Sequence, residues 1–237
     1  MTTETKSTIQ GYFNAIARRY DILNSILSFG LHHFWKRAAI RLAALQPGSA
    51  VADICGGTAD LALRAANAVG SDGHVAVYDF SFEMMRAGTA KCTLAAAPAP
   101  IAFVCGDAEL MALKNNSFDA ALIGFGLRNL RDREQGLREM YRILKPGGRL
   151  VCLEFSQPAW KWFRCLYDLY SFAFIPLAGK LVTGSHAAYA YLPESIRRFP
   201  APDKLAAMMA DANFTAIEYK RLLNGIAVIH VGKKADG

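Results

Sequence analysis

From residue 50 onward, the chain alternates between short apolar runs and longer amphipathic stretches. Unbroken apolar runs of about five residues predict buried strands, whereas apolar positions spaced three and four apart predict helices. The strands are expected at 50–54, 74–78, 101–105, 118–123 and 149–155, and the helices at 58–69, 81–96 and 132–144. A turn is expected at 145–148, just before the fifth of these strands. This alternation is typical of an α/β protein with a doubly wound parallel sheet.

The end of the chain predicts a hairpin that joins this sheet. A helix is expected at 203–212, followed by strands at 214–219 and 226–230 with an Asn224-Gly225 pair in the loop between them. Asn-Gly is a common turn between antiparallel strands. The complete sheet is therefore expected to have seven strands, mostly parallel, in a Rossmann-like arrangement.

Residues 1–46 read as helices that precede the sheet. Four apolar side chains recur at helical spacing and share one face: Tyr12, Phe13, Ile16 and Tyr20. A second helical pattern covers 34–45, and Gln46-Pro-Gly48 ends the region. We expect these helices to cover the ligand site.

An aromatic insertion at about 158–199 interrupts the alternation near its end. Its longest uncharged stretch, 169–179, is too short to span a bilayer. We interpret it as a lid over an apolar acceptor pocket, within a single domain that covers 1–237. The alternative is a lid helix that packs against the body and has no ligand role.

Composition narrows the class of protein. Of the 237 residues, 53% are hydrophobic and 20% are charged, which permits a substantial core. Five cysteines without a C-x-x-C pair, and a polar start without an apolar run, predict a cytoplasmic protein with reduced thiols. The histidines show no metal-ligand spacing, so no metal is expected.

The net charge of +7 raises the question of an anionic partner. The basic residues do not form a run with interleaved aromatics, so nucleic acid is not expected. They occur in small groups that flank apolar segments, which suits an anionic membrane surface.

The most informative residues lie where the first three predicted strands end. The first strand contains Asp53 and runs into a tight turn at Gly56, which is followed by Thr58 and a helix. Such a turn places backbone N–H groups and a helix N-terminus against a ligand. Thr58 stands where a dinucleotide fingerprint would have its second glycine, so a nucleoside without a pyrophosphate fits better. S-adenosylmethionine meets that description.

Two acids continue this pattern. Asp79 ends the second strand, where a carboxylate can accept hydrogen bonds from both ribose hydroxyls. Asp107 and Ala108 follow the third strand, where a carboxylate can accept from an adenine amine. The alternatives are that the glycine turn only connects two elements, and that Asp79 caps the helix starting near Ser81.

The chain resembles the ubiquinone/menaquinone biosynthesis C-methyltransferases over nearly its whole length. The specific stretches are Tyr20-Asp-x-x-Asn24, Trp35-Lys-Arg37, Cys55-Gly-Gly-Thr-Ala-Asp60 and Gly124-Phe-Gly-Leu-Arg-Asn129, with Leu144-Lys-Pro-Gly-Gly-Arg149 as a weaker match. The resemblance implies a class I S-adenosylmethionine-dependent methyltransferase. It places cofactor contacts on Thr58, Asp79, Asp107, Ala108 and, through the backbone alone, Gly124. Ala59 departs from the ubiquinone-type pattern, and Gly124 stands where one branch of the family has a serine. Together with Asp79-Phe-Ser81, these positions look more like the menaquinone-only branch.

The resemblance further implies methylation of a ring carbon of a prenylated quinol, with demethylmenaquinol favoured over a benzoquinol. Removal of the hydroxyl proton needs assistance, for which His32, Arg128 and Asn129 are candidates. Arg128 can stabilise a phenolate but cannot easily act as a base. A packing role for His32 and an ion pair of Arg128 with Asp132 are the alternatives.

Other functions stay open at this point. A methyltransferase acting on another aromatic acceptor is one, and a nicotinamide-dependent oxidoreductase is a less favoured one because the glycine fingerprint is missing. A nucleic-acid methyltransferase would explain the net charge, but the sequence has no Asp/Asn-Pro-Pro-Tyr/Phe motif and no Pro-Cys dipeptide. The expected partners are a lipid-tailed quinol and a transient membrane surface, at the inner face of the cell membrane. A homodimer is left open.

Overall fold

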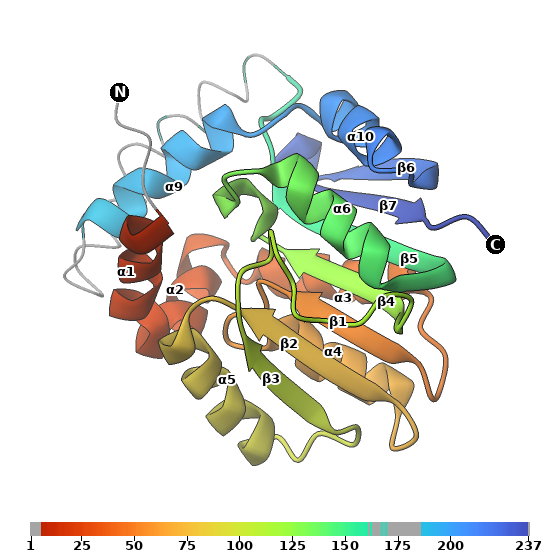
Figure 1. Ribbon diagram of the computed structural model, residues 1–237. Helices are drawn as coiled ribbons and strands as arrows, with labels where there is room; N and C mark the ends of the chain where they lie inside the picture. The colour runs from red at the N-terminus through yellow and green to blue at the C-terminus, as the bar shows by residue number, and fades with distance from the viewer. Residues whose placement is uncertain (1–5, 161, 163–166, 168, 170–185, 237) are drawn as a thin grey trace.

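The computed structural model describes residues 6–160, 162, 167, 169 and 186–236. At its centre is a seven-stranded sheet in the order β3-β2-β1-β4-β5-β7-β6 (Figure 1). The strands are β1 (Ala50–Ile54), β2 (His74–Asp79), β3 (Ile101–Cys105), β4 (Phe118–Gly124), β5 (Leu144–Phe155), β6 (Thr215–Leu222) and β7 (Ala227–Lys233). The strands β1 to β5 pair in parallel, and β7 runs antiparallel to β5 and β6. The predicted mostly parallel sheet with a terminal hairpin is confirmed.

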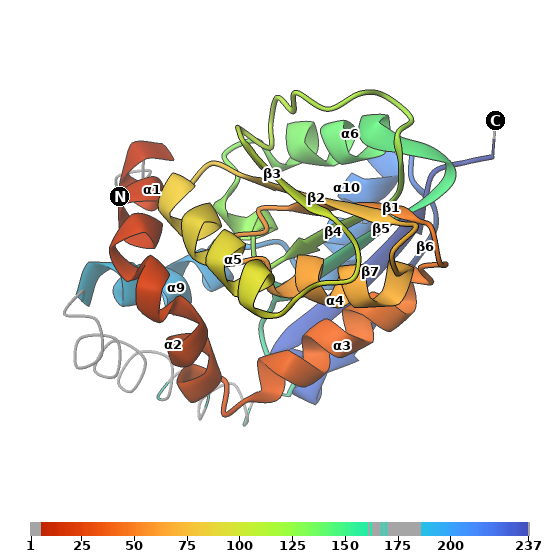
Figure 2. The ribbon, with the colours of Figure 1, turned by 90° about the horizontal axis from the view of Figure 1, so that it is seen from below.

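Helices cover both faces of this sheet (Figure 2). The helices α3 (Leu31–Ala43), α4 (Asp60–Val69) and α5 (Phe82–Leu94) pack on one face. The helices α6 (Arg133–Ile143) and α10 (Pro202–Asp211) pack on the other. The strand order reverses at β1, which lies between β2 and β4. Ligands of doubly wound sheets bind at the carboxyl ends of the strands near this reversal.

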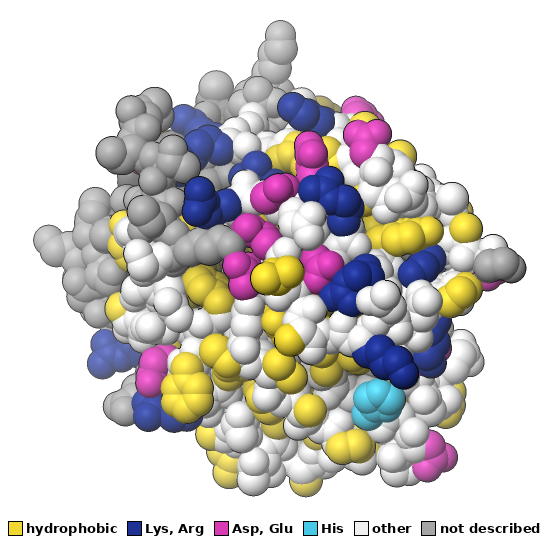
Figure 3. All heavy atoms as spheres, viewed as in Figure 1, with side chains coloured by type: hydrophobic (Ala, Val, Ile, Leu, Met, Phe, Trp, Pro, Cys, Tyr) yellow, Lys and Arg dark blue, Asp and Glu magenta, His cyan; other side chains and the backbone are white. Residues whose placement is uncertain are grey.

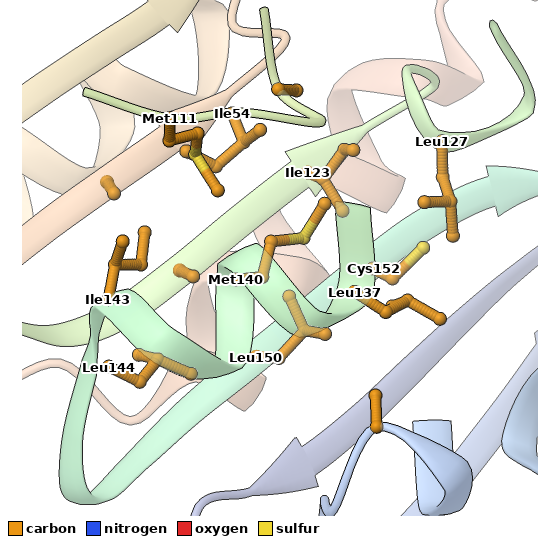
Figure 4. Packing of buried hydrophobic residues seen from close by; sticks show 14 of the residues in the cluster. Ile54, Met111, Ile123, Leu127, Leu137, Met140, Ile143, Leu144, Leu150 and Cys152 are labelled. Atoms are coloured by element: carbon orange, nitrogen blue, oxygen red, sulfur yellow. The ribbon is translucent and has the colours of Figure 1, made fainter. Parts of the chain in front are cut away.

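The core explains why these sequences form these elements. On α6, Leu137, Met140 and Ile143 recur at helical spacing, and all three are fully buried. They point onto Ile123 and Leu150 of the neighbouring strands (Figure 4). Each such side chain contributes about 1.5–3 kcal/mol through burial of apolar surface.

The N-terminal helices differ in detail from the prediction. The first helix, α1 (Lys6–Ile16), ends at a short 3₁₀ turn, Ala17–Arg19, and Tyr20 begins a separate helix, α2 (Tyr20–Leu27). Tyr20 therefore belongs to a different helix from Tyr12, Phe13 and Ile16, although all four side chains pack in one apolar cluster. The next helix, α3, begins at Leu31, earlier than the predicted start at 34.

One predicted turn lies inside a strand. The segment 145–148 was expected to be a turn before the fifth strand, but β5 begins at Leu144 and continues through it. The pairing with β4 absorbs the extra residues, because Phe118 pairs with Leu144 whereas Ala120 pairs with Arg149. The Pro-Gly-Gly sequence thus forms an irregularity of the strand pair.

Only part of the aromatic insertion can be compared with its prediction. Its last helix, α9 (His186–Arg198), lies with α1 and α2 at the end of the sheet toward which β1, β2 and β4 point (Figures 1 and 2). Residues 161, 163–166, 168 and 170–185 lie outside the described residues, so the predicted lid stays a prediction. In the part of the chain that the structure describes, no helix is long and apolar enough to cross a membrane.

Candidate functional site

A cavity of about 280 Å³ opens at the carboxyl ends of β1, β2, β3 and β4. All seven residues that the sequence predicted for the cofactor line it: Asp53, Gly56, Thr58, Asp79, Asp107, Ala108 and Gly124. The helices α1, α2 and α3 contribute further lining through Phe13, Tyr20 and Lys36. Of the three predicted catalytic residues, Asn129 lines the cavity, whereas Arg128 and His32 do not.

The turn after β1 has a backbone that requires glycine. Gly57 has a φ of 53°, in the left-handed region that favours glycine. A Cβ on Gly56 would lie 2.9 Å from the Asp53 carboxylate and from Val77. The turn therefore brings bare backbone to the cavity.

Asp53 lies beneath this turn as a buried acid. Its Oδ2 accepts a hydrogen bond from the backbone N–H of Ala62 at 2.9 Å, and its Oδ1 has no partner among the described residues. Burial raises the pKa of Asp53 to about 7. An acceptor without a partner in a cavity wall fits a ligand that brings a hydrogen-bond donor.

Asp79 is held in place by backbone donors. Its Oδ2 accepts from the N–H of Gly57 at 2.9 Å, and its Oδ1 accepts from the N–H of Ser81 at 2.8 Å. Burial raises the pKa of Asp79 to about 6, although these bonds oppose the shift. The alternative role of Asp79 as a helix cap is wrong, because Ser81 caps α5 through its Oγ, which accepts from Met84. Each Asp79 oxygen keeps a second lone pair for a ligand.

Beyond β3, Asp107 and Ala108 also take up positions that suit a ligand. The Asp107 Oδ1 accepts from the N–H of Glu109 at 3.0 Å, which shapes the turn, and Ala108 is buried. The preceding Gly106 has no room for a side chain, since a Cβ would lie 2.1 Å from the hydroxyl of Tyr78.

Thr58 belongs to a polar network that the sequence did not predict. Its hydroxyl donates to Oδ1 of Asp21 at 2.6 Å, and Lys91 binds Oδ2 of Asp21 at 2.7 Å. Lys91 and Lys36 also bind the two oxygens of Asp60, at 2.8 and 2.7 Å. Burial opposes ionisation of Asp60, but the two lysines lower its pKa well below the usual range. This network fastens α2 to α4 and α5 beside the cavity.

Arg128 has a partner other than the one considered from the sequence. Its Nη1 donates to Oε1 of Glu154 at 2.7 Å, and the two side chains are 5% and 2% exposed. Asp132 instead caps α6, where its Oδ1 accepts from the N–H of Gln135 at 2.8 Å. The predicted alternative of an Arg128–Asp132 pair is therefore wrong.

Asn129 connects the turn after β4 to the cavity. Its Oδ1 accepts a hydrogen bond from the hydroxyl of Tyr191 at 3.1 Å, and its Nδ2 lies 3.5 Å from the carbonyl oxygen of Phe125. Phe125 lines the cavity and stacks on Phe155, with ring centroids 4.4 Å apart. An amide thus lies beside aromatic rings on this side of the cavity.

His32 is buried in α3 and makes a local contact. Its Nδ1 lies 2.7 Å from Oγ of Ser28, and its ring lies against His33 at 3.9 Å between centroids. Burial, with Lys36 and His33 as neighbours, lowers the pKa of His32 to about 4. These contacts fit the packing alternative and do not bring His32 to the cavity.

His32 also belongs to a cluster that the sequence spacing did not indicate. Ligand atoms of His32, His33 and Asp60 lie within 4.8 Å of one another. Both oxygens of Asp60 are already bound to lysines, however, and two ammonium groups disfavour a metal cation at this position.

Charge on the face shown in Figure 3 is mixed. Basic and acidic side chains are interspersed there, and the basic ones do not form a stripe. A continuous basic stripe would be the electrostatic footprint of a nucleic-acid site.

Comparisons with known proteins agree with this architecture. A model of the ubiE/COQ5 methyltransferase family matches residues 1–234. The chain is 44% identical over 222 residues to the ubiquinone/menaquinone biosynthesis C-methyltransferase UbiE of Pseudomonas putida (strain W619), covering 94% of this chain and 87% of that protein. It is 41% identical over 226 residues to the protein of that name from Shewanella oneidensis, covering 95% and 90%.

Solved structures share the fold at low identity. A possible histamine N-methyltransferase of Thermotoga maritima has a TM-score of 0.66 at 18% identity, covering 95% of this chain and 99% of that one. A putative S-adenosylmethionine-dependent methyltransferase of Methanococcus maripaludis has a TM-score of 0.65 at 17% identity, covering 100% and 98%. At such identities the likeness shows the fold alone.

Proposed function

Because the chain belongs to the ubiE/COQ5 methyltransferase family, we propose that it methylates a ring carbon of a lipid-tailed quinol in quinone biosynthesis, with S-adenosylmethionine as methyl donor. The observation that carries the proposal is the single cavity in which all seven residues predicted for the cofactor meet an aromatic wall. The relatives named above are C-methyltransferases of ubiquinone and menaquinone biosynthesis, which supports this class of acceptor.

The strand-end residues fit the parts of S-adenosylmethionine, which supplies an electrophilic methyl group on a positively charged sulfur. We assign Asp79 to the ribose hydroxyls, because its two oxygens are fixed by backbone donors and each can accept one more bond. We assign Asp107 to the adenine amine. We assign the partnerless Oδ1 of Asp53 to a hydrogen-bond donor at the end of S-adenosylmethionine away from the adenine. The glycines at 56 and 57 let the backbone approach closely.

The acceptor ring is expected to be a quinol. An oxidised quinone carbon is electrophilic, whereas the carbon beside an ionised hydroxyl of a hydroquinone is a nucleophile. We place the ring against Phe125 and Tyr20, with Asn129 as a hydrogen-bond donor to its oxygen. Desolvation of its hydroxyl raises the pKa of Tyr20, and the positive charge of Arg128 opposes that shift. Arg128 thus lies near Tyr20, but its charge is already paired with the carboxylate of Glu154.

We favour demethylmenaquinol over a benzoquinol as the acceptor. The support is the combination of Ala59, Ser81 and Gly124 at positions where the resemblance separates the two branches. The structure adds a reason for Gly124, because a Cβ there would lie 2.6 Å from Cδ1 of Leu61. A serine at 124 would require Leu61 to move.

The test uses purified enzyme with S-adenosylmethionine and either demethylnaphthoquinol or a 6-methoxybenzoquinol, each reduced by dithionite or oxidised by air. Methylated naphthoquinol should form, and only in the reduced samples, as measured by mass spectrometry. Equal rates with reduced and oxidised substrate would contradict the carbon nucleophile. Faster methylation of the benzoquinol would overturn the choice of acceptor, and an accumulated demethyl precursor in a deletion strain would identify the physiological one.

We also propose that the protein collects this substrate at an anionic membrane surface. On α2, Ile22 and Ile26 are 60% and 43% exposed on one helix face, while Tyr20 of the same helix lines the cavity. Trp160 and Trp162 are exposed as well. Between residues 6 and 52 the sequence contains a single acid, Asp21, among several basic residues.

Vesicle flotation tests the membrane proposal. Binding should favour vesicles that contain phosphatidylserine over phosphatidylcholine alone and weaken with salt, since each basic side chain near an anionic surface contributes about 1 kcal/mol. The Ile22→Ser/Ile26→Ser variant should float less, whereas Leu94→Ser, which alters an apolar side chain at the end of α5, should behave as wild type. Flotation that does not depend on lipid charge and is unchanged in the Ile22→Ser/Ile26→Ser variant would contradict the proposal.

A further inference from the structure

The turn after β4 brings Asn129 to the cavity on a strained backbone. Phe125 has a φ of 58°, which non-glycine residues rarely adopt. A Cβ on Gly126 would lie 2.5 Å from the Cβ of Cys55, so this turn packs tightly against the turn after β1. Strained backbone persists where the surrounding structure holds it. Contacts from other elements must therefore fix this turn.

The first of these contacts comes from β5. Glu154 Oε2 accepts from the backbone N–H of Arg128 at 3.2 Å, and Oε1 accepts from Nη1 of Arg128 at 2.7 Å. The same Oε1 accepts from the N–H of Phe155 at 2.8 Å. One buried carboxylate thus holds the middle of the turn through both its backbone and its side chain.

The second contact comes from α9 and acts on the Asn129 side chain. The Tyr191 hydroxyl donates to Oδ1 of Asn129 at 3.1 Å, across 62 positions of sequence. The Tyr191 hydroxyl takes one lone pair of that oxygen, and the nitrogen of the same amide keeps two N–H donors for a ligand. Among the described residues, the one contact of these donors is with the carbonyl oxygen of Phe125, and it is long at 3.5 Å. A donor in this place suits a hydroxyl or phenolate oxygen.

We propose that Tyr191 is a positioning residue, which orients the Asn129 amide so that its nitrogen faces the oxygen of the acceptor ring. Tyr191 itself does not line the cavity and acts through Asn129. Glu154 holds the backbone of the same turn through Arg128. The role in turnover rests on the proposed function, whereas the orientation of the amide is a property of the protein alone.

Kinetics test the role in turnover. Tyr191→Phe removes only the hydroxyl, so kcat should fall roughly tenfold, as for a weakened transition-state donor, while KM for the quinol and cofactor affinity stay within about threefold of wild type. In an Asn129→Ala background, Tyr191→Phe should cause no further loss. Tyr219→Phe is the matched control, because Tyr219 lies on the exposed strand β6 and its hydroxyl donates to Asp203 of α10. Unchanged kcat in Tyr191→Phe, or equal losses in both backgrounds, overturns the proposal.

NMR tests the orientation without any substrate. The side-chain N–H₂ signals of Asn129, identified by their loss in Asn129→Ala, should move in Tyr191→Phe and stay in place in Tyr219→Phe. Unmoved signals in Tyr191→Phe overturn the proposal whatever the enzyme methylates. If the signals move but the wild type methylates no quinol, the proposed acceptor is wrong and the orientation of the amide by Tyr191 stands.

Discussion

Replacing Asp79 by asparagine should weaken cofactor binding without disturbing the fold. The carboxylate accepts from Gly57 and Ser81 at 2.9 and 2.8 Å, which leaves one lone pair on each oxygen for a ribose hydroxyl. Asparagine has the same shape but only one accepting oxygen. Its nitrogen must face either a backbone N–H or a ribose hydroxyl, so at least one charged hydrogen bond is lost.

The magnitude follows from that loss. A hydrogen bond to a charged group contributes about 1.5–3 kcal/mol, so Kd for S-adenosylmethionine should rise about 10- to 150-fold. Isothermal calorimetry measures Kd, and thermal unfolding checks the fold. Asp132→Asn is the control, because its carboxylate also accepts from a backbone N–H, as the cap of α6, but lies outside the cavity lining.

The pH dependence gives a second readout of the same carboxylate. Burial raises the pKa of Asp79 to about 6. Ribose hydroxyls donate to the charged form, so binding lowers this pKa, and affinity should fall as the pH drops below about 6, by up to tenfold per pH unit. The Asp79→Asn variant should lack this part of the pH dependence. Binding within threefold of wild type at neutral pH, or an unchanged pH profile in the variant, would refute the ribose assignment.

Two further predictions concern stability. The pKa of His32 is lowered from 6.5 to about 4 in the folded protein. Between these two values the unfolded chain binds a proton at His32 and the folded protein does not. Acid should therefore destabilise wild type relative to His32→Gln. Urea unfolding at pH 7.5 and 4.5 should show this relative loss to be about 2–3 kcal/mol; a difference that is independent of pH would contradict the burial of a neutral imidazole. Arg128→Met leaves Glu154 buried without its partner and should lower the free energy of unfolding by about 3–5 kcal/mol, whereas the Arg128→Met/Glu154→Met double variant should recover part of the loss. A single variant within 1 kcal/mol of wild type would mean that the pair is not buried in solution.

The sheet and the residues at its strand ends could be predicted from local sequence patterns. Apolar runs and helical spacing are local properties, and they located the strands of the parallel sheet in chain order. The carboxyl ends of adjacent parallel strands lie at one edge of the sheet, so the topology brings the residues at these ends together. Asp53, Asp79 and Asp107 therefore converge in one cavity although no local pattern links them.

The contacts between side chains that are distant in the sequence depend on how the elements pack. Asp132 was the partner considered for Arg128 because it lies four residues on, a spacing that pairs side chains only within a helix. The helix α6 starts at Arg133, after both residues, and the partner is Glu154 on the adjacent strand. Packing determines which side chains of different elements form hydrogen bonds. The hydrophobic periodicity along the chain does not predict these pairs.

Packing between elements also explains why His32 does not line the cavity and why Asn129 contacts Tyr191. A helical pattern shows that residues share a face, but it does not show what that face packs against. In α3 the His32 ring contacts Ser28 and His33. The hydrogen bond from Tyr191 to Asn129 spans 62 positions and joins α9 to the turn after β4. Whether a side chain reaches the cavity is decided by how the helices pack over the sheet, which is a property of the folded chain.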